Sequence, residues 1–331
     1  MNRSAIGWTD LTSNPIRYRD PAGHVVWGCE RTSPGCAHCY AAALAKRYGR
    51  GAGAFTAEEM ATYTPFLDEK EVHRILTATV VSGQRVSGSR CFIGDMTDIF
   101  GEWVPDELLD RLFTAMALRM DVTFQVLTKR PDRMRAYMQR LAASTVEPKN
   151  RDWPDLFGSP MLYLTELLGE RRMLALCDQP DWSNAWPLPN VWLGTSVENQ
   201  HWANERIPQL LQTPAAVRFI SAEPLLGPID LMDLSVGSAP DSLDAFTGET
   251  CSSETTCIVV EGPGLDWVIV GGESGQHARP VPVDAITSIV RQCAAAGVQA
   301  FVKQDCGSKP GLQGDIPDDI WAVKQFPAVA A

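Results

Sequence analysis

The feature of this chain that most constrains its fold is an alternation of short apolar runs with helical segments. The runs are rich in Val, Ile and aromatic residues, as expected for strands. Short apolar strands separated by helices are typical of a parallel sheet that helices cover. We therefore predict an α/β fold, built as a complete or partial (β/α) barrel. The predicted strands span residues 24–28, 90–94, 122–128, 190–195, 217–221, 266–271 and 299–303.

Helical segments separate these strands. Residues 105–120 begin with Pro-Asp-Glu, a favourable first turn, and then place apolar residues at helical spacing. Further helices are predicted at 36–48, 131–141, 199–211 and 283–296. Two segments interrupt the alternation, one at about 142–189, rich in Trp and Pro, and one at about 231–264, rich in Ser, Thr, Gly and Asp. With 331 residues and 45% hydrophobic content, we expect a single domain, 1–331, that carries these two insertions.

Composition limits where the protein works and what it binds. The chain has no run of about 18 apolar residues, and its N-terminal segment lacks the apolar core of a signal peptide. We therefore expect a cytoplasmic protein with no membrane partner. In a reducing compartment, nine cysteines favour metal binding or catalysis over a disulfide framework. The formal net charge of −11 argues against a surface that binds nucleic acid throughout, but not against a local basic groove.

Each predicted strand ends in polar or Gly-rich residues. In a (β/α) barrel the carboxyl ends of the strands meet on one face, where the active site lies. Loops are polar in general, but seven such strand ends favour a shared site. The first strand leads into Cys29, and the others end in GDMTD (Asp95, Thr97, Asp98), TKR (Lys129), TSVEN (Ser196, Glu198), SAEP (Glu223), GGESG (Glu273) and KQD (Lys303, Gln304).

The strongest local signal is a group of three cysteines, Cys29, Cys36 and Cys39, with the spacing C-x6-C-x2-C. Thiolates are soft ligands that suit iron–sulfur clusters or zinc. Three protein ligands leave one iron of a [4Fe–4S] cluster free to bind a substrate or cofactor. A structural zinc normally has a fourth ligand, which His24 or His38 could supply. The pattern favours a cluster and leaves zinc open.

Seven sequence blocks run in order along nearly the whole chain, outside the two insertions. They are IGWTD (6–10), GCERTSPGCAHCYA (28–41), LTKRPDR (127–133), VWLGTSVENQ (191–200), RFISAEPLLGPI (218–229), DWVIVGGESG (266–275) followed by ARP (278–280), and FVKQ (301–304). In these blocks the chain resembles the phage-type radical-SAM-like proteins of uncharacterised function, which also occur in bacterial genomes.

That family is similar to the radical S-adenosylmethionine (SAM) superfamily, and loosely to spore photoproduct lyase. The resemblance implies a partial (β/α) barrel and a [4Fe–4S] cluster that cleaves SAM reductively to a 5′-deoxyadenosyl radical, with a flavodoxin or ferredoxin as reductant. The superfamily's common motif is C-x3-C-x2-C, and here the first gap is six residues. His38 stands where an aromatic residue usually precedes the third cysteine. The phage association suggests a DNA base or nucleotide as substrate, and the host cytoplasm as the location of a phage-encoded protein.

The strand-end pattern and the resemblance assign expected roles to the polar residues. In the superfamily a Gly-Gly-Glu sequence after the second strand contacts the methionine amino group, whereas GGESG follows the sixth predicted strand of this chain. The GDMTD segment is therefore the better match by position. We expect cofactor contacts from His38, Asp95, Thr97, Asp98, Ser196 and Glu198, and a catalytic, substrate-facing side formed by Lys129, Glu223, Glu273, Lys303 and Gln304.

Structural roles remain open for some of these residues. Asp98 could cap a turn, Lys129 could form a buried salt bridge, and Glu198 could favour the first turn of a helix. Two other functions also remain open. A zinc-stabilised module that binds nucleic acid or protein without catalysis predicts a fourth zinc ligand. An acid/base hydrolase predicts proton transfer by Glu223 and Glu273 and dispensable cysteines.

Overall fold

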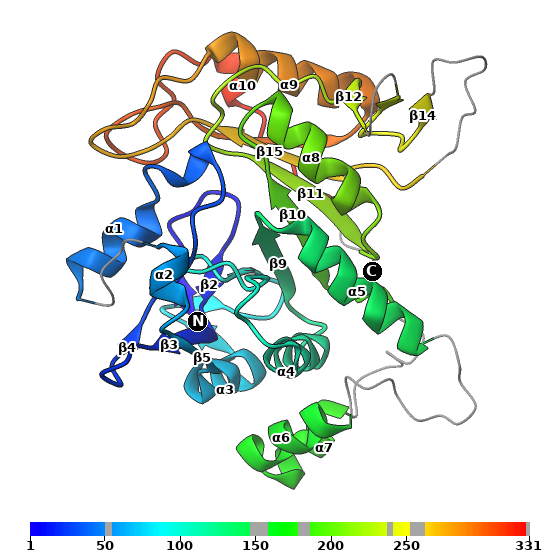
Figure 1. Ribbon diagram of the computed structural model, residues 1–331. Coiled ribbons are helices and arrows are strands. Elements are labelled where there is room, and N and C mark those ends of the chain that lie inside the picture. The colour runs from blue at the N-terminus through cyan, green and yellow to red at the C-terminus, as the bar shows by residue number, and fades with distance from the viewer. Residues whose placement is uncertain (50–54, 146–157, 178–185, 237–240, 252–261, 329–331) are drawn as a thin grey trace.

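A computed structural model describes the chain except for residues 50–54, 146–157, 178–185, 237–240, 252–261 and 329–331. In these described residues the main element is a curled sheet of eight strands that forms an open half-barrel (Figure 1). β1 pairs antiparallel with β2, and the other neighbouring strands are parallel. In spatial order the strands are β1 (Asn2–Arg3), β2 (Leu11–Ser13), β8 (Arg90–Ile93), β9 (Thr123–Thr128), β10 (Val191–Ser196), β11 (Val217–Ala222), β15 (Trp267–Gly271) and β16 (Gln299–Gln304).

The two faces of the sheet pack differently, because successive side chains of a strand point to opposite sides. One face carries an aromatic-rich cluster. It consists of Trp8, Phe92, Trp192, Val217, Phe219, Trp267, Ile269 and Phe301. On the other face, Ile93, Leu193 and Val268 belong to the core cluster that includes Leu112 and Ile207 of the helices. The helices therefore cover one side of the sheet, and the aromatic cluster lies beneath the other.

Helices alternate with the parallel strands, which confirms the predicted α/β class. The main helices are α3 (Glu69–Thr77), α4 (Asp106–Ala117), α5 (Pro131–Thr145), α8 (Gln200–Leu211), α9 (Val283–Ala296) and α10 (Asp318–Trp321). Figure 1 shows α9, α8, α5 and α4 in an arc outside the sheet. α8 begins after Asn199, whose side chain accepts a hydrogen bond from the Trp202 amide (3.2 Å). α9 ends at Gly297, which has a φ of +71°.

Six of the seven predicted strands are present within one residue at each end. The first, at 24–28, is present only as a two-residue strand, and it does not belong to the main sheet as expected. β4 (Val25–Val26) lies in a separate antiparallel sheet with β3 (Ile16–Arg19) and β5 (Thr64–Leu67). The first parallel strand of the main sheet is β2, whose three residues, LTS, are too few and too polar to form an apolar run.

The predicted helix at 36–48 is shorter than expected. It is replaced by a 3₁₀ turn, η1 (Pro34–Cys36), and by α1 (Tyr40–Arg47), because Cys39 between them has an extended ψ of 121°. A short helix, α2 (Ala57–Met60), follows the segment that lies outside the described residues.

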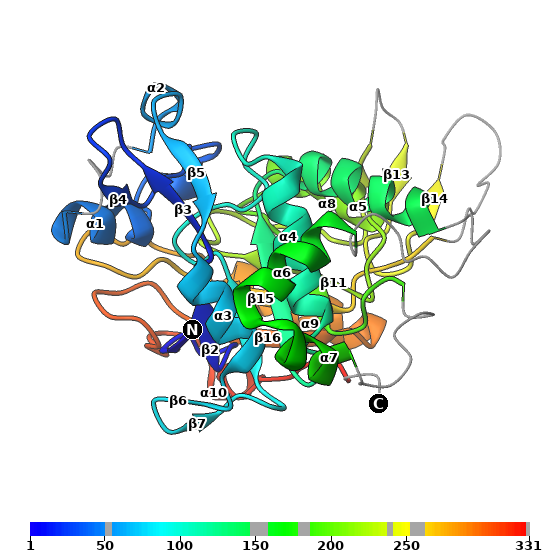
Figure 2. The same cartoon turned by 90° about the horizontal axis from the view of Figure 1, so that it is seen from below.

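The two predicted insertions contain structure of their own. The first holds α6 (Ser159–Leu168) and α7 (Glu170–Cys177), and the second holds a sheet of β12 (Leu234–Ser235), β13 (Ser242–Leu243) and β14 (Thr250–Cys251). The rest of both segments lies partly outside the described residues. A hairpin of β6 (Val80–Val81) and β7 (Gln84–Arg85) completes the elements. Figure 2 shows α1 and the β13–β14 pair at opposite sides of the molecule. None of the described helices is long and apolar enough to cross a bilayer.

Candidate functional site

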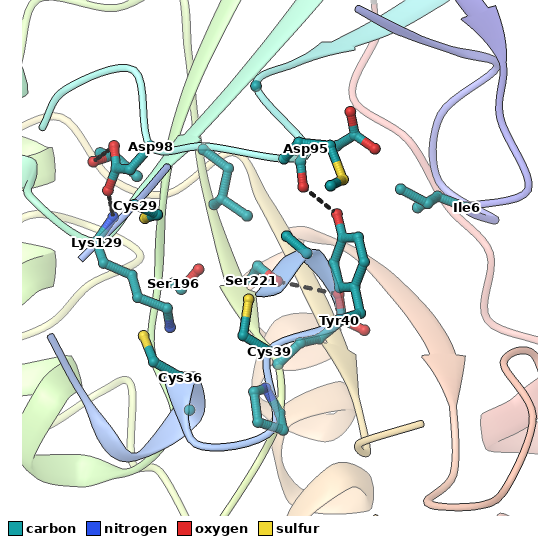
Figure 3. Close-up of a pocket in the computed structure, with 18 of the residues that line it drawn as sticks. Ile6, Cys29, Cys36, Cys39, Tyr40, Asp95, Asp98, Lys129, Ser196 and Ser221 are labelled. Carbon is teal, nitrogen blue, oxygen red and sulfur yellow. Dashed lines mark hydrogen bonds between the residues drawn. The ribbon is translucent and has the colours of Figure 1, made fainter. Parts of the chain in front are cut away.

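The carboxyl ends of the parallel strands and the cysteine segment surround a cavity of about 260 Å³ (Figure 3). Strand ends far apart in the sequence meet here because the strands are parallel neighbours in one sheet. All predicted site residues except Glu198 line this cavity. They are Cys29, Cys36, His38, Cys39, Asp95, Thr97, Asp98, Lys129, Ser196, Glu223, Glu273, Lys303 and Gln304.

The segment from β4 to α1 presents three thiols to the cavity. Cys29 follows β4, Cys36 ends the 3₁₀ turn, and Cys39 directly precedes α1. The buried face of α1 consists of three alanines, which pack with Phe55 and Met96. Small side chains allow the helix to lie close to the segment after β8, and this packing fixes the position of Cys39.

The three thiols have different electrostatic surroundings. Burial raises the pKa of Cys29 to about 12, and the nearby Asp98 carboxylate adds to this effect. Burial also raises the pKa of Cys39. At Cys36 burial acts in the same direction, but the Lys129 ammonium and backbone amides of the preceding loop outweigh it and lower the pKa. A cation beside a cysteine favours the thiolate, which is the form that binds metals.

The three thiols line one cavity. Cys29, Cys36 and Cys39 occupy separate positions on its wall (Figure 3). Among the residues that the structure describes, no group of three or more His, Cys, Asp or Glu side chains could hold a single metal ion.

Glu198 lies behind the cavity wall, where it binds the cysteine segment instead of lining the cavity. Its side chain is fully buried. It forms ion pairs with Lys129 and with Arg206 (Nη1 to Oε2, 3.2 Å). The Ser33 hydroxyl donates to its Oε1 at 2.6 Å. A Cβ at Gly35 would lie only 2.7 Å from the Glu198 Cγ, so the backbone of the cysteine turn rests directly on this side chain.

Glu273 also holds the cysteine segment, through His38 and Arg279. Arg279 donates to both of its carboxylate oxygens (Nε to Oε2, 3.0 Å; Nη2 to Oε1, 2.6 Å) and also to the carbonyl of Pro34 (3.0 Å). His38 pairs with Glu273 at 2.8 Å. Two buried carboxylates, Glu198 and Glu273, therefore fix the cysteine segment to the ends of β10 and β15.

Glu273 is fully ionised at neutral pH. Burial raises its pKa, but the hydrogen bonds from Arg279 and His38 outweigh burial and lower it from 4.5 to about 2. A general acid needs a pKa near the working pH. Glu273 therefore lacks the property that the hydrolase hypothesis requires of a proton donor.

We expect Glu273→Gln to destabilise the protein at about pH 7 and much less at about pH 2.5. A carboxylate with a lowered pKa stabilises the folded state above its unfolded pKa and loses this contribution as the pH falls through the folded pKa. The unfolding free energy should drop by about 1–3 kcal/mol at neutral pH, and the difference should narrow between pH 4.5 and about 2. Urea unfolding at both pH values measures the difference in unfolding free energy between the wild type and the variant. Glu249→Gln, at an exposed position, is the control. Equal differences at the two pH values would contradict this explanation.

Thr97 and Asp98, predicted to bind a cofactor, have structural partners. The Thr97 hydroxyl donates to the Gly28 carbonyl (2.6 Å), which ties the end of β8 to the residue before Cys29. Asp98 accepts from the Thr128 hydroxyl (2.7 Å), the Lys129 amide (3.0 Å) and Arg130 Nη1 (3.3 Å). Both residues therefore organise the turn after β8, and this was the alternative left open for Asp98.

The other polar residues of the cavity divide into two kinds. Lys303 Nζ pairs with Glu223 Oε1 (3.0 Å), and the Ser221 hydroxyl donates to Glu223 Oε2 (3.1 Å), so this ion pair stands in the cavity wall. The Gln304 amide instead donates to the Gly272 carbonyl (2.8 Å) and accepts from the Gly311 amide (3.0 Å). Gln304 therefore stabilises the loop after β16.

Residues 3–313 match the family model described as "Protein of unknown function (DUF5131)". The chain belongs to this family. No curated protein and no solved structure matches it. The cavity residues of this DUF5131 chain, from Ile6 to Gln304, all lie within the matched range.

Four residues that the sequence analysis did not select shape the site of this DUF5131 protein. Ser33 and Arg279 hold the cysteine segment, and Arg206 neutralises Glu198. Arg130 pairs with Asp98, and its guanidinium lies 4.7 Å from the Trp103 ring centroid. Ser33, Arg130 and Arg279 belong to the conspicuous blocks SPGC, LTKRPDR and ARP, so those blocks did contain a signal. Arg206 lies inside α8, outside these blocks, and no sequence signal marks it.

Proposed function

We propose that this protein is a radical SAM enzyme in which Cys29, Cys36 and Cys39 hold a [4Fe–4S] cluster. The observation that carries the proposal is the arrangement of three thiols around one cavity at the carboxyl ends of the half-barrel strands. On this proposal the sheet is a partial barrel of the radical SAM type, and the three cysteines would hold a cluster with one iron left free for SAM.

The set of donors that lines the cavity favours a cluster over a zinc ion. A tetrahedral zinc needs all of its ligands at about 2.0–2.3 Å from one ion. A [4Fe–4S] cluster instead bonds each thiolate to a different iron atom, so its ligands stand further apart. The two histidines considered as a fourth zinc ligand have other partners, since His24 pairs with Asp20 (3.1 Å) and His38 pairs with Glu273. The donor set therefore fits the cluster.

When bound, such a cluster supplies the electron that cleaves SAM to methionine and a 5′-deoxyadenosyl radical. The protein's residues bind, orient and shield the reactants. Asp95 and Ser196 offer polar groups at the cavity wall for the amino and hydroxyl groups of SAM. Ile6, Phe92 and Leu127 line the cavity with apolar surface that excludes water from it.

The substrate side of the cavity is formed by the ion pair of Glu223 and Lys303. Lys129 also lines the cavity and forms an ion pair with Glu198. We propose a nucleic-acid base or nucleotide as the substrate and a flavodoxin or ferredoxin as the source of the electron.

The experiment that tests this function is a product assay under anaerobic conditions. Protein incubated with dithionite and SAM should release 5′-deoxyadenosine and methionine in equal amounts, measured by liquid chromatography. Cys39→Ala should release neither, and Cys293→Ala, a buried thiol of α9 outside the cavity, should behave as wild type. Colourless protein with stoichiometric zinc and no products would sink the radical proposal in favour of the zinc-stabilised module.

A further inference from the structure

One face of α1 presents aromatic and basic side chains to solvent. Tyr40 is 48% exposed and Tyr48, which caps the helix, is 66% exposed. Lys46 and Arg47 are exposed beside them. The Arg47 guanidinium lies 5.7 Å from the Tyr48 ring centroid, a cation–π contact that holds the two side chains together. Because the opposite face of α1 is packed against the body of the protein, this face is directed outward.

The segment that contains α1 has a charge opposite to that of the whole protein. The chain has 40 acidic and 29 basic residues, yet the described residues 31–49 contain three Lys or Arg and no Asp or Glu. If charges were distributed evenly along the chain, this segment would contain more acidic than basic residues. A basic segment within an acidic protein instead creates a local positive potential, which attracts polyanions to one place.

Tyr40 connects this face to the cavity. Its ring lines the cavity while nearly half of the residue remains exposed, so it lies at the mouth. Its hydroxyl donates to the Asp95 carbonyl (2.5 Å), which fixes the ring there (Figure 3). Beyond it, Trp8 and Phe92 form an apolar aromatic wall. α1 lies at the edge of the molecule in both views (Figures 1 and 2).

We propose that this face of α1 binds single-stranded nucleic acid and directs one base into the cavity. Cations attract the phosphates, and exposed tyrosines stack on bases without sequence preference. Stacking on an exposed ring requires unpaired bases, and a cavity of about 260 Å³ suits one base better than a base pair. The inference rests on the proposed function for what happens in the cavity, but the binding itself does not require a cluster.

Fluorescence anisotropy with a labelled single-stranded oligonucleotide tests this proposal on the full protein, purified anaerobically. We expect affinity that falls steeply as salt rises. Arg47→Ala and Tyr48→Ala should each weaken binding about tenfold. Arg111→Ala is the matched control, because Arg111 forms the same kind of pair with Tyr163 (4.5 Å), among residues that do not line the cavity. A duplex of the same sequence should bind more weakly.

Three outcomes overturn the proposal. The first is that the wild-type protein binds no oligonucleotide at low salt. The second is that Arg47→Ala and Tyr48→Ala bind the oligonucleotide as the wild type does. The third is that these two variants keep oligonucleotide binding but are reduced more slowly by flavodoxin. The last would assign the face to an acidic protein partner. Iron analysis of the same samples separates the two proposals. Iron-free protein that binds oligonucleotide through α1 contradicts the radical function alone, and iron-loaded protein that does not bind contradicts this inference alone.

Discussion

Cys36→Ala should abolish cluster binding. Wild-type protein purified without oxygen should contain about four iron and four sulfide per chain, and the variant should contain almost none. Cys36 is the informative choice, because Lys129 lowers the pKa of its thiol and so favours the metal-binding thiolate. The Ser33 hydroxyl oxygen lies 3.9 Å from the Cys36 sulfur and donates a hydrogen bond to Glu198. The surrounding structure is thus organised around this thiol.

Iron and sulfide analysis, together with the charge-transfer absorbance of the purified protein, measures this result. Cys177→Ala is the matched control, since Cys177 is a free thiol at the end of α7 and does not line the cavity. It should keep full iron content. Thermal unfolding of both variants establishes that iron is lost from a folded protein. Full iron content in Cys36→Ala, or one zinc per chain in the wild type, would refute the cluster assignment.

The sheet could be predicted from sequence where its strands are apolar. Strands such as β10 and β15 are buried along their whole length, and each begins with an apolar run, VWL in β10 and WVIV in β15. β2 could not be predicted because its three residues are partly polar. The apolar pair of β4 instead gave the prediction of a first strand. Polar residues at strand ends predicted the cavity, because parallel strands bring their ends together whatever loops connect them.

The contacts that hold the site could not be predicted in the same way. Ser33 and Glu198 are 165 residues apart along the chain, and Pro34 and Arg279 are 245 apart. No local periodicity relates such residues, and only the packing of the folded chain brings them together. For the same reason the sequence placed Glu198 in the cavity: its position after β10 was correct, but the direction of its side chain is decided by Lys129 and Arg206.

Glu198→Ala should therefore cause a large loss of stability. The side chains of Glu198 and Arg206 are 0% and 3% exposed, and that of Lys129 is 20% exposed. Removal of the carboxylate leaves two cations without their shared counter-charge in a poorly solvated place. Loss of one partner from a buried ion pair typically costs about 3–5 kcal/mol. Urea unfolding should show this loss. Glu205→Ala, at an exposed position of α8, should change the unfolding free energy little.

A second variant tests whether Glu198 positions the cysteine turn, without removing its buried charge. Gly35→Ala keeps Glu198, but the added Cβ would lie 2.7 Å from the Glu198 Cγ, well inside the 3.5–4.0 Å at which carbon atoms make optimal contact. The turn that carries Cys36 must then move away from its support, and we expect iron content to fall by about half or more while the fold persists. Gly227→Ala is the matched control, since its Cβ would meet only Asn199 at 3.8 Å. If Gly35→Ala kept full iron content, Glu198 would stabilise the barrel without positioning the cysteines.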